Sequence, residues 1–249
     1  MTLTINGIKT ILKNEGILSF IKRFFNYSSK IIYYPYYLIN IKNKKAADIN
    51  SSIDIAFDHG KGIIRPLQVK SEIKELLSIL EKKKPKYMME IGTANGGTLF
   101  LFSRTCDANA NIISLDLRRG KFGGGYPIWR IPLYKSFAIK NQNIHLVRAD
   151  SHKKETVKKI NNILNGNKLD FLFIDGDHTY EGVKKDFEMY KQLVKKDGII
   201  AFHDIVEHND EAIGVNKIWN EIKSNYNYKE IIENWNQNWA GIGIILNKI

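Results

Sequence analysis

The chain has 249 residues, of which 43% are hydrophobic and 26% charged, a balance typical of a globular protein with room for one α/β domain and an extension. Its net charge of +12 comes with no recognised nucleic-acid-binding motif, so we do not expect nucleic acid as a partner. The single cysteine, Cys106, excludes an intramolecular disulfide framework and fits a reducing, cytoplasmic compartment.

The first 45 residues are the most basic part of the chain. They hold eight Lys or Arg residues against one acid, Glu15, a net charge of +7. Lys9 and Lys13 interrupt the apolar region that a signal peptide would need. The apolar run at residues 31–41 has about half of the ~20 residues that would cross a bilayer.

Apolar residues recur at roughly helical spacing in this segment and are followed by a tyrosine cluster: Ile8, Ile11, Leu12, Leu18, Ile21, Phe25, Tyr33, Tyr34, Tyr36 and Tyr37. Such a helix can lie on an anionic membrane surface, giving a membrane-peripheral enzyme, or pack on the domain or on another subunit of a homo-oligomer. Residues 46–65 are polar and predict a linker. The chain would thus comprise an extension at 1–65 and a domain at 66–249.

From Pro66 onward, helical and strand patterns alternate, which predicts an α/β fold with a mostly parallel sheet and helices on both faces. The expected strands are 87–91, 111–115, 144–148, 171–174, 199–202, 228–233 and 242–246. The first expected helix begins near Pro66, and the other expected helices span 97–105, 151–164, 180–194 and 211–224. The last two strands are joined by a short turn and predict an antiparallel hairpin. A glycine-rich insertion at 118–132 predicts an active-site lid.

The run Glu90-Ile-Gly-Thr-Ala-Asn-Gly-Gly-Thr98 joins the first strand to its helix. Gly92 allows a tight turn, and Gly96-Gly97 lets the backbone approach a ligand at the helix amino terminus. The spacing differs from the dinucleotide fingerprint. An acid on this strand suits a ligand with an ammonium group better than a pyrophosphate.

Further polar residues follow successive strands. Asp116 ends the second strand about 20 residues after the glycines, where nucleotide-binding sheets hold ribose hydroxyls. Asp150 and Ser151 follow the third strand and could reach an adenine edge. The buried run Phe171–Ile174 leads into Asp175, Asp177 and His178, and Thr179 or His178 can cap the next helix.

These segments resemble the class I S-adenosylmethionine-dependent methyltransferases, within the Methyltransf_24 branch that includes cephalosporin-hydroxylase-like proteins and sugar O-methyltransferases. The matching segments are 90–98, 113–116, 148–151, 170–186 and 198–205. The resemblance implies a Rossmann-like seven-stranded sheet with an antiparallel last strand. It also implies S-adenosylmethionine as cofactor and a sugar or glycan hydroxyl as acceptor.

By matching position, the resemblance assigns the cofactor to residues at the ends of the first four strands: Glu90, Gly92, Thr93, Gly97, Thr98, Asp116, Asp150, Ser151 and Asp175. The metal-dependent members hold Mg²⁺ at the positions of Asp175, His203 and Asp204. His203 replaces an acid there, so Mn²⁺, Fe²⁺ or Zn²⁺ stay open beside Mg²⁺. His178 matches the general base of the sugar-modifying relatives, and Asp177 is expected to be structural. We assign no metal role to His208 and no role to His145 or His152.

The sequence thus predicts a metal-assisted O-methyltransferase with His178 and Asp175 as its catalytic residues. Two alternatives stay open. The first is an NAD-dependent oxidoreductase on a similar sheet, against which the spacing of the glycines after Glu90 argues. The second is a non-catalytic binding module, against which the presence of Asp175, His178 and Asp204 argues.

Overall fold

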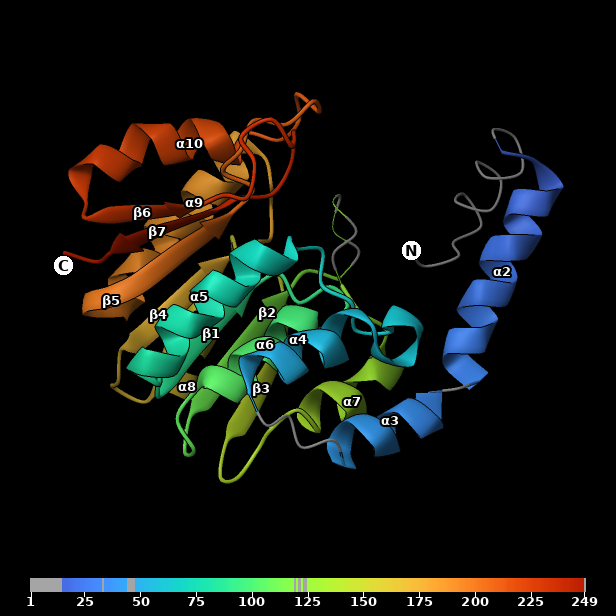
Figure 1. Ribbon diagram of the computed structural model, residues 1–249. Helices are drawn as coiled ribbons and strands as arrows, with labels where there is room; N and C mark the ends of the chain where they lie inside the picture. The colour runs from blue at the N-terminus through green and yellow to red at the C-terminus, as the bar shows by residue number, and fades with distance from the viewer. Residues whose placement is uncertain are drawn as a thin grey trace. The chain divides into compact units, whose positions relative to one another are not determined.

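The computed structural model describes residues 15–32, 34–43, 48–118, 120, 122 and 125–248. The chain divides into two compact units, Met1–Lys45 and Ala46–Ile249. The first unit contains the helices α2 (Gly16–Ile32) and α3 (Tyr34–Asn43). The helical pattern expected around Leu18, Ile21 and Phe25 corresponds to α2 (Figure 1), whereas Ile8, Ile11 and Leu12 lie outside the described residues.

The second unit is built on a seven-stranded sheet with the order β3-β2-β1-β4-β5-β7-β6. Neighbouring strands from β3 to β5 are parallel, and β7 is antiparallel to both β5 and β6. The predicted closing hairpin and Rossmann-like architecture are therefore confirmed. The strands are β1 (Tyr87–Ile91), β2 (Asn111–Asp116), β3 (Asn143–Arg148), β4 (Leu169–Ile174), β5 (Val194–His203), β6 (Tyr228–Ile231) and β7 (Ile242–Leu246).

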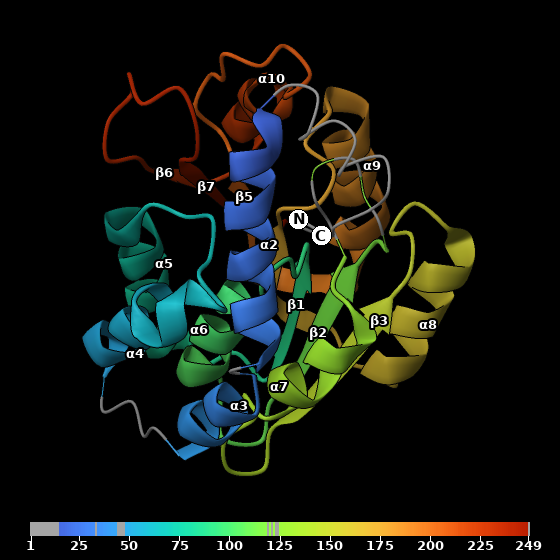
Figure 2. The ribbon, with the colours of Figure 1, turned by 90° about the vertical axis from the view of Figure 1, so that its right-hand side faces the viewer.

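Helices cover both faces of this sheet, as the buried apolar strands require. Figure 2 shows α4, α5 and α6 on one side and α8 and α9 on the other. The helices are α4 (Ile49–Phe57), α5 (Lys70–Lys83), α6 (Gly97–Thr105), α7 (Ile131–Lys135), α8 (Lys154–Leu164), α9 (Tyr180–Tyr190) and α10 (Val215–Ile222). Short 3₁₀ turns are η1 (His59–Gly62), η2 (Ile128–Arg130), η3 (Lys191–Leu193) and η4 (Lys223–Asn225).

Aromatic side chains fill the core on both sides of the sheet. Phe102 of α6 packs edge-on against Phe171 and Phe173 of β4, with both pairs of ring centroids 5.2 Å apart. On the other face, the ring centroids of Phe202 of β5 and Trp219 of α10 lie 5.7 Å apart. Each such ring, fully buried, contributes about 1.5–3 kcal/mol to folding. This packing fixes the positions of the loops that leave β4 and β5.

Strand order reverses between β1 and β4, since the chain moves outward from β1 to β2 and β3 before it returns to β4. Open α/β sheets bind ligands at such a point, outside the carboxyl ends of the strands. Backbone hydrogen bonds continue past these strand ends. The Gly92 amide donates to the Leu115 carbonyl, and the Asp175 amide donates to the Ile91 carbonyl at 2.9 Å. The loops after β1, β2 and β4 are thereby held together.

Residues 46–65 differ from the predicted linker and belong to the compact second unit. Asp48 begins α4 with a reciprocal cap, its carboxylate accepting from the Ser51 amide at 2.8 Å. The helix buries an apolar stripe comprising Ile53, Ile55, Ala56 and Phe57. A Cβ added at Gly97 would lie 2.2 Å from the Ile64 carbonyl oxygen, so α6 begins in direct contact with this segment. The boundary between units therefore falls after residue 45, and not after residue 65.

Two further expectations need correction. The helix expected to reach Val194 ends at Tyr190, and β5 begins at Val194 and not at Ile199. The Asn247 side chain donates to the Val194 carbonyl at 2.8 Å, which secures this early start of the strand. The insertion at 118–132 is not wholly irregular, because η2 and α7 form from residue 128 onward.

The predicted cap Thr179 is confirmed, since its hydroxyl accepts from the Gly182 amide at 3.0 Å.

Candidate active site

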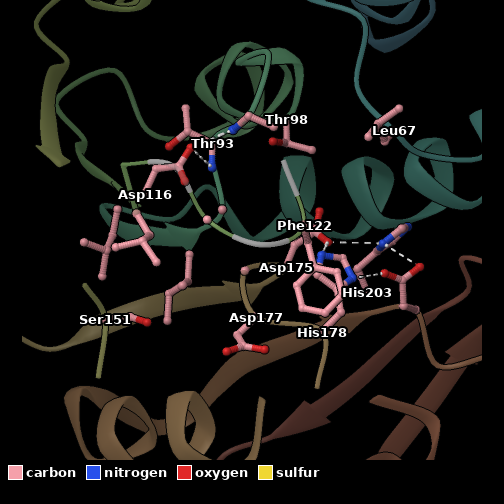
Figure 3. A pocket seen from close by; sticks show the side chains of 18 of the residues that line it. Leu67, Thr93, Thr98, Asp116, Phe122, Ser151, Asp175, Asp177, His178 and His203 are labelled. Atoms are coloured by element: carbon pink, nitrogen blue, oxygen red, sulfur yellow. Dashed lines mark hydrogen bonds and ion pairs between the residues drawn. The ribbon is translucent and has the colours of Figure 1, made fainter. Parts of the chain in front are cut away.

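A cavity of about 430 Å³ opens at the carboxyl ends of β1, β2, β4 and β5. It is lined by the turn after β1, by Asp116 and Asp175 at the ends of β2 and β4, and by His178. Figure 3 shows Thr93 and Asp116 at one end and Asp175, His178 and His203 at the other. One continuous space therefore connects most of the residues that the sequence analysis singled out.

The turn after β1 has a backbone that only glycine adopts without strain. Gly92 has φ +100°, and a Cβ there would lie 1.9 Å from the Asp175 carbonyl oxygen. Gly96 is left-handed at the start of α6, where a Cβ would lie 2.5 Å from the Tyr134 ring. Gly92, Thr93, Gly97 and Thr98 all line the cavity, as predicted. The close packing fixes this turn at the base of the cavity.

Glu90 does not reach this cavity, contrary to the prediction that it lines the methionine end. The carboxyl is fully buried and accepts hydrogen bonds from Ser114 at 2.7 Å and Thr98 at 3.0 Å. Burial raises the pKa of Glu90 to about 8, with a smaller contribution from nearby Asp116. Thr98 does line the cavity, so its hydroxyl connects buried Glu90 to the cavity wall.

Asp116 holds the glycine turn and the insertion together at the cavity edge. One carboxylate oxygen accepts from the amides of Thr93 at 3.2 Å and Ala94 at 2.9 Å, and the other accepts from Gly125 at 2.9 Å. Burial raises the pKa of Asp116, although these hydrogen bonds act to lower it. Gly120 and Phe122 of the same insertion line the cavity, while residues 119, 121, 123 and 124 of the predicted lid lie outside the described residues.

Asp150 and Ser151 also line the cavity, beyond Asp116 and after β3. The Asp150 carboxylate accepts from the His152 amide at 2.8 Å, which shapes the turn before α8. The glycine turn, Asp116, Asp150 and Ser151 therefore line one cavity, and their assignment to the cofactor stays a prediction.

Acidic and histidine side chains from β4 and β5 gather at the other end of the cavity. His178 Nδ1 lies 2.5 Å from Asp204 Oδ2, and His178 Nε2 lies 3.9 Å from Asp175 Oδ1. Ligand atoms of Asp175, His178 and Asp204 all fall within 4.8 Å of one another. Asp204 has a left-handed backbone (φ 65°), an uncommon conformation for a residue other than glycine that is often found at functional sites.

His203 lies beneath this cluster, and its position differs in detail from the predicted metal ligand. Its Nδ1 is 3.3 Å from Asp175 Oδ1 and 3.2 Å from Asp204 Oδ1, so the ring joins the two carboxylates. Its Nε2 is buried without a hydrogen-bond partner. The three residues whose possible ligand atoms converge are therefore Asp175, His178 and Asp204. The sequence analysis predicted His203, and not His178, as the histidine of this group.

The charges in this cluster stabilise one another. Burial alone would lower the pKa of His203, but Asp204 and Asp175 outweigh it and hold that pKa well above its usual value. Burial likewise opposes protonation of His178, whereas the hydrogen bond to Asp204 and the charge of Asp175 raise its pKa overall. For Asp204, burial is outweighed by the three histidines, and its pKa lies well below the usual range.

Several residues of this end were not predicted as site residues. Gln68, which precedes α5, donates to Asp175 Oδ2 at 3.0 Å. His208 Nε2 lies 3.1 Å from Asp204 Oδ1, although the sequence gave it no metal role. Trp239 enters from the β6–β7 loop and lines the cavity with 42% of its surface exposed. No local motif marks these residues, because their roles depend on contacts with strands far away in sequence.

Asp177 has the structural role expected of it. Its carboxylate accepts from the Thr179 amide at 3.0 Å and from the Thr179 hydroxyl at 2.8 Å. A Cβ at Gly182 would lie 2.1 Å from the Asp177 carboxyl carbon, so that carboxyl packs directly on α9. Asp177 thus fixes the turn that presents His178.

Comparison with known proteins gives a family and a fold. Residues 89–205 match the model of the Methyltransf_24 family, described as a methyltransferase domain. The uncharacterized protein R132 of Acanthamoeba polyphaga mimivirus is 30% identical over 155 residues, covering 61% of this chain and 67% of that protein. The uncharacterized protein y4gI of Sinorhizobium fredii is 25% identical over 142 residues, which cover 56% of this chain and 15% of that protein.

Solved structures share the architecture at low sequence identity. The O-methyltransferase TomG from Streptomyces achromogenes, in complex with SAM, has a TM-score of 0.55 at 13% identity, covering 83% of this chain and 92% of TomG. The O-methyltransferase from Bacillus cereus, in complex with SAH, has a TM-score of 0.55 at 14% identity, covering 84% and 95%. Residues 89–205 of this chain therefore form a methyltransferase domain of the Methyltransf_24 family, on a fold shared with these SAM- and SAH-bound O-methyltransferases.

Proposed function

We propose that the protein transfers a methyl group from S-adenosylmethionine to a hydroxyl oxygen, with His178 as the general base. One observation carries this proposal. A single cavity connects the glycine turn and Asp116 to the cluster of Asp175, His178 and Asp204. A methyl donor at one end would thus face an acid–base group at the other.

The residues at the first end fit the proposed donor. Gly92 and Gly97 bring the backbone close to its amino-acid tail, Asp116 offers a carboxylate to ribose hydroxyls, and Asp150 with Ser151 lies where the base would extend. S-adenosylmethionine supplies a methyl group already activated on a sulfonium. What remains for the protein is to align the acceptor oxygen and remove its proton.

His178 has the geometry for that proton transfer. Asp204 is ionised and can only accept, so the Nδ1–H of His178 donates to it across 2.5 Å. In the neutral imidazole this leaves Nε2 free to take a proton from an acceptor hydroxyl in the cavity. Asp204 thereby orients the ring and stabilises the imidazolium that forms. General bases of this kind contribute about 10²–10⁴-fold to rate.

A second reading of the same residues is metal assistance. Two carboxylates and an imidazole that converge within 4.8 Å suit a divalent cation, which would be held by Asp175, His178 and Asp204. A bound divalent ion lowers the pKa of a coordinated hydroxyl. Oxygen ligands favour the predicted Mg²⁺, while the imidazole also suits Mn²⁺, Fe²⁺ or Zn²⁺. This role competes with the base role of His178, because one imidazole nitrogen cannot serve both.

For the acceptor we propose a sugar or glycan hydroxyl. Trp239 and Leu67, 42% and 70% exposed, line the cavity and offer apolar surface against which a sugar ring can pack. Buried Glu72 of α5 fixes the loop that carries Trp239. Its carboxylate accepts from the Glu233 amide at 3.0 Å, the Gln237 side chain at 2.8 Å and the Gly241 amide at 2.9 Å. The Ala240 amide also donates to Asp204 at 3.1 Å, which ties the same loop to the cluster.

Ligand binding separates these proposals from the alternatives. The midpoint temperature of thermal unfolding of the full chain should rise when S-adenosylhomocysteine is added and stay unchanged when NAD is added. Transfer of labelled methyl to a panel of sugars, nucleotide sugars and catechols then identifies the acceptor class. Stabilisation by NAD alone would point to an oxidoreductase. Stabilisation by S-adenosylhomocysteine without transfer to any oxygen acceptor would point to a binding module.

A further inference from the structure

The helix α2 carries an apolar stripe that its own unit leaves exposed. Six large apolar residues have between 41% and 80% of their surface exposed: Ile17, Leu18, Ile21, Phe24, Phe25 and Ile32. At about 100° per residue, these positions fall within an arc of about 120° around the helix axis. Ser28 lies within the arc, and Lys22 lies beside it. The helix is thus amphipathic along its whole length.

An exposed apolar surface of this size indicates a binding partner that covers it. Isolated apolar residues on a protein surface are ordinary, but a continuous stripe marks an interaction site. Phe24 lies between Phe20 and Phe25, with ring centroids 6.1 and 6.3 Å away. The aromatic residues therefore form one cluster in the middle of the helix.

The charge of this segment selects the kind of occupant. The sequence of α2 contains three basic residues and no acidic one. Residues 1–45 as a whole carry eight Lys or Arg residues against one acid, Glu15. Two identical basic helices repel one another. A lipid surface with negative headgroups, in contrast, can bind both faces of one helix, because its acyl chains contact the apolar stripe and its headgroups attract the lysines.

The segment also lacks the length to cross a bilayer. No helix among the described residues combines enough length with enough apolar character to span a membrane. With 17 residues and basic side chains between its apolar ones, α2 matches a helix that lies in the plane of the interface. Figure 1 shows it as one uninterrupted helix.

We propose that α2 docks the protein on anionic membrane surfaces, with the stripe of Ile17, Leu18, Ile21, Phe24, Phe25 and Ile32 in the headgroup–acyl boundary. The proposal concerns α2 and the basic segment around it, and it does not depend on methyl transfer. It implies that acceptors near or within a membrane surface would be met at raised local concentration.

Co-sedimentation of the full chain with vesicles tests the proposal. The chain should pellet with vesicles of phosphatidylglycerol and phosphatidylcholine at low salt, and should bind at least about tenfold more weakly to pure phosphatidylcholine. The double variant Phe24→Ser/Phe25→Ser should lose at least about tenfold in binding. Trp235→Ser removes an aromatic that is 60% exposed outside α2, and should bind like the unaltered chain.

Two results would overturn the proposal. In the first, the chain stays in the supernatant with anionic vesicles. In the second, the chain is a dimer in sedimentation equilibrium, the Phe24/Phe25 variant is a monomer, and vesicles leave the dimer intact, so a second copy covers the stripe. Circular dichroism and the thermal shift with S-adenosylhomocysteine show that each variant is folded, which keeps a failure of docking distinct from a failure of the proposed chemistry.

Discussion

His178 Nδ1 lies 2.5 Å from Asp204 Oδ2, and this contact joins the loop after β4 to the end of β5. It fixes the imidazole so that Nε2 is the free nitrogen on the side of Asp175. An Asp–His pair of this kind explains how a histidine in a cavity with 19% of its side chain exposed can accept a proton without losing its orientation. The two residues therefore act as one unit in the proposed reaction.

Replacement of the orienting carboxylate should separate positioning from chemistry. Asp204→Asn keeps the size of the side chain but removes the charge that stabilises the imidazolium. We expect kcat to fall about 10²-fold or more, with the affinity for S-adenosylhomocysteine unchanged, because Asp204 lies at the acceptor end. Steady-state kinetics and calorimetric titration measure both. An equal loss of cofactor affinity would indicate a collapse of the site instead.

Chelation distinguishes the two readings of the acidic cluster. If a divalent ion assists the reaction, prolonged dialysis against EDTA should lower activity at least about tenfold, and Mg²⁺ or Mn²⁺ should restore it. The Asp175→Asn variant should then lose the metal-dependent rise in thermal stability. Full activity after dialysis, with no metal found by elemental analysis, would leave His178 as the base without a metal.

The glycine turn should be intolerant of a methyl group. Gly92→Ala places a Cβ 1.9 Å from the Asp175 carbonyl oxygen at φ +100°, so we expect a loss of about 3 kcal/mol or more in unfolding free energy, together with loss of cofactor binding. Gly166→Ala is the matched control, because Gly166 has φ +83° but open space around it, and should cost about 1 kcal/mol. Urea denaturation of both variants makes the comparison. Similar losses would mean that the close packing at Gly92 is not required.

Buried Glu90 should make stability fall as pH rises. Its pKa is about 8 when folded against a usual value of 4.5, so between these values the folded chain binds more protons than the unfolded chain. The free energy of unfolding then decreases with pH, by up to about 1.4 kcal/mol per unit from this group. Glu90→Gln removes the titration, so its stability relative to the unaltered chain should increase from pH 5 to 8. Parallel stability curves for the two proteins would contradict this.

Trp239 should affect the acceptor and not the cofactor. Because Trp239 lines the cavity near the acidic cluster, Trp239→Ala should raise the KM for the acceptor several-fold while the Kd for S-adenosylhomocysteine stays constant. Trp235→Ala, in the same loop but outside the cavity, is the control and should behave like the unaltered chain. If both variants had the same KM, the wall formed by Trp239 would have no part in acceptor binding.

Local patterns predicted the parallel core of the fold well. Buried apolar runs such as Phe171–Ile174 and the turn residues that follow them predicted β1 to β4 to within two residues, whereas the start of β5 and the end of α9 were misplaced by four or five. The segment around α4 was missed because its nine residues include two serines and an aspartate, too short and polar for a clear helical period. Its helix is stabilised by packing on α6, which no local pattern reports.

Site residues at strand ends could be predicted from the sequence. Site residues whose position depends on contacts between distant segments could not. Asp116 ends a strand, Asp150, Asp175 and His178 follow strands, and the sheet brings all four to one cavity. Glu90 was misplaced because the pattern does not show that Thr98 and Ser114 enclose it.

Methyl transfer itself tests the proposed function most directly. The full chain should transfer labelled methyl from S-adenosylmethionine to the hydroxyl of a sugar acceptor, and His178→Ala should reduce kcat about 10²–10⁴-fold while S-adenosylhomocysteine binds with unchanged affinity. His145→Ala is the matched histidine control, because His145 lies on β3, contacts Asn111 and does not line the cavity. It should retain full activity. Unchanged kcat in His178→Ala would contradict the assignment of His178 as the base.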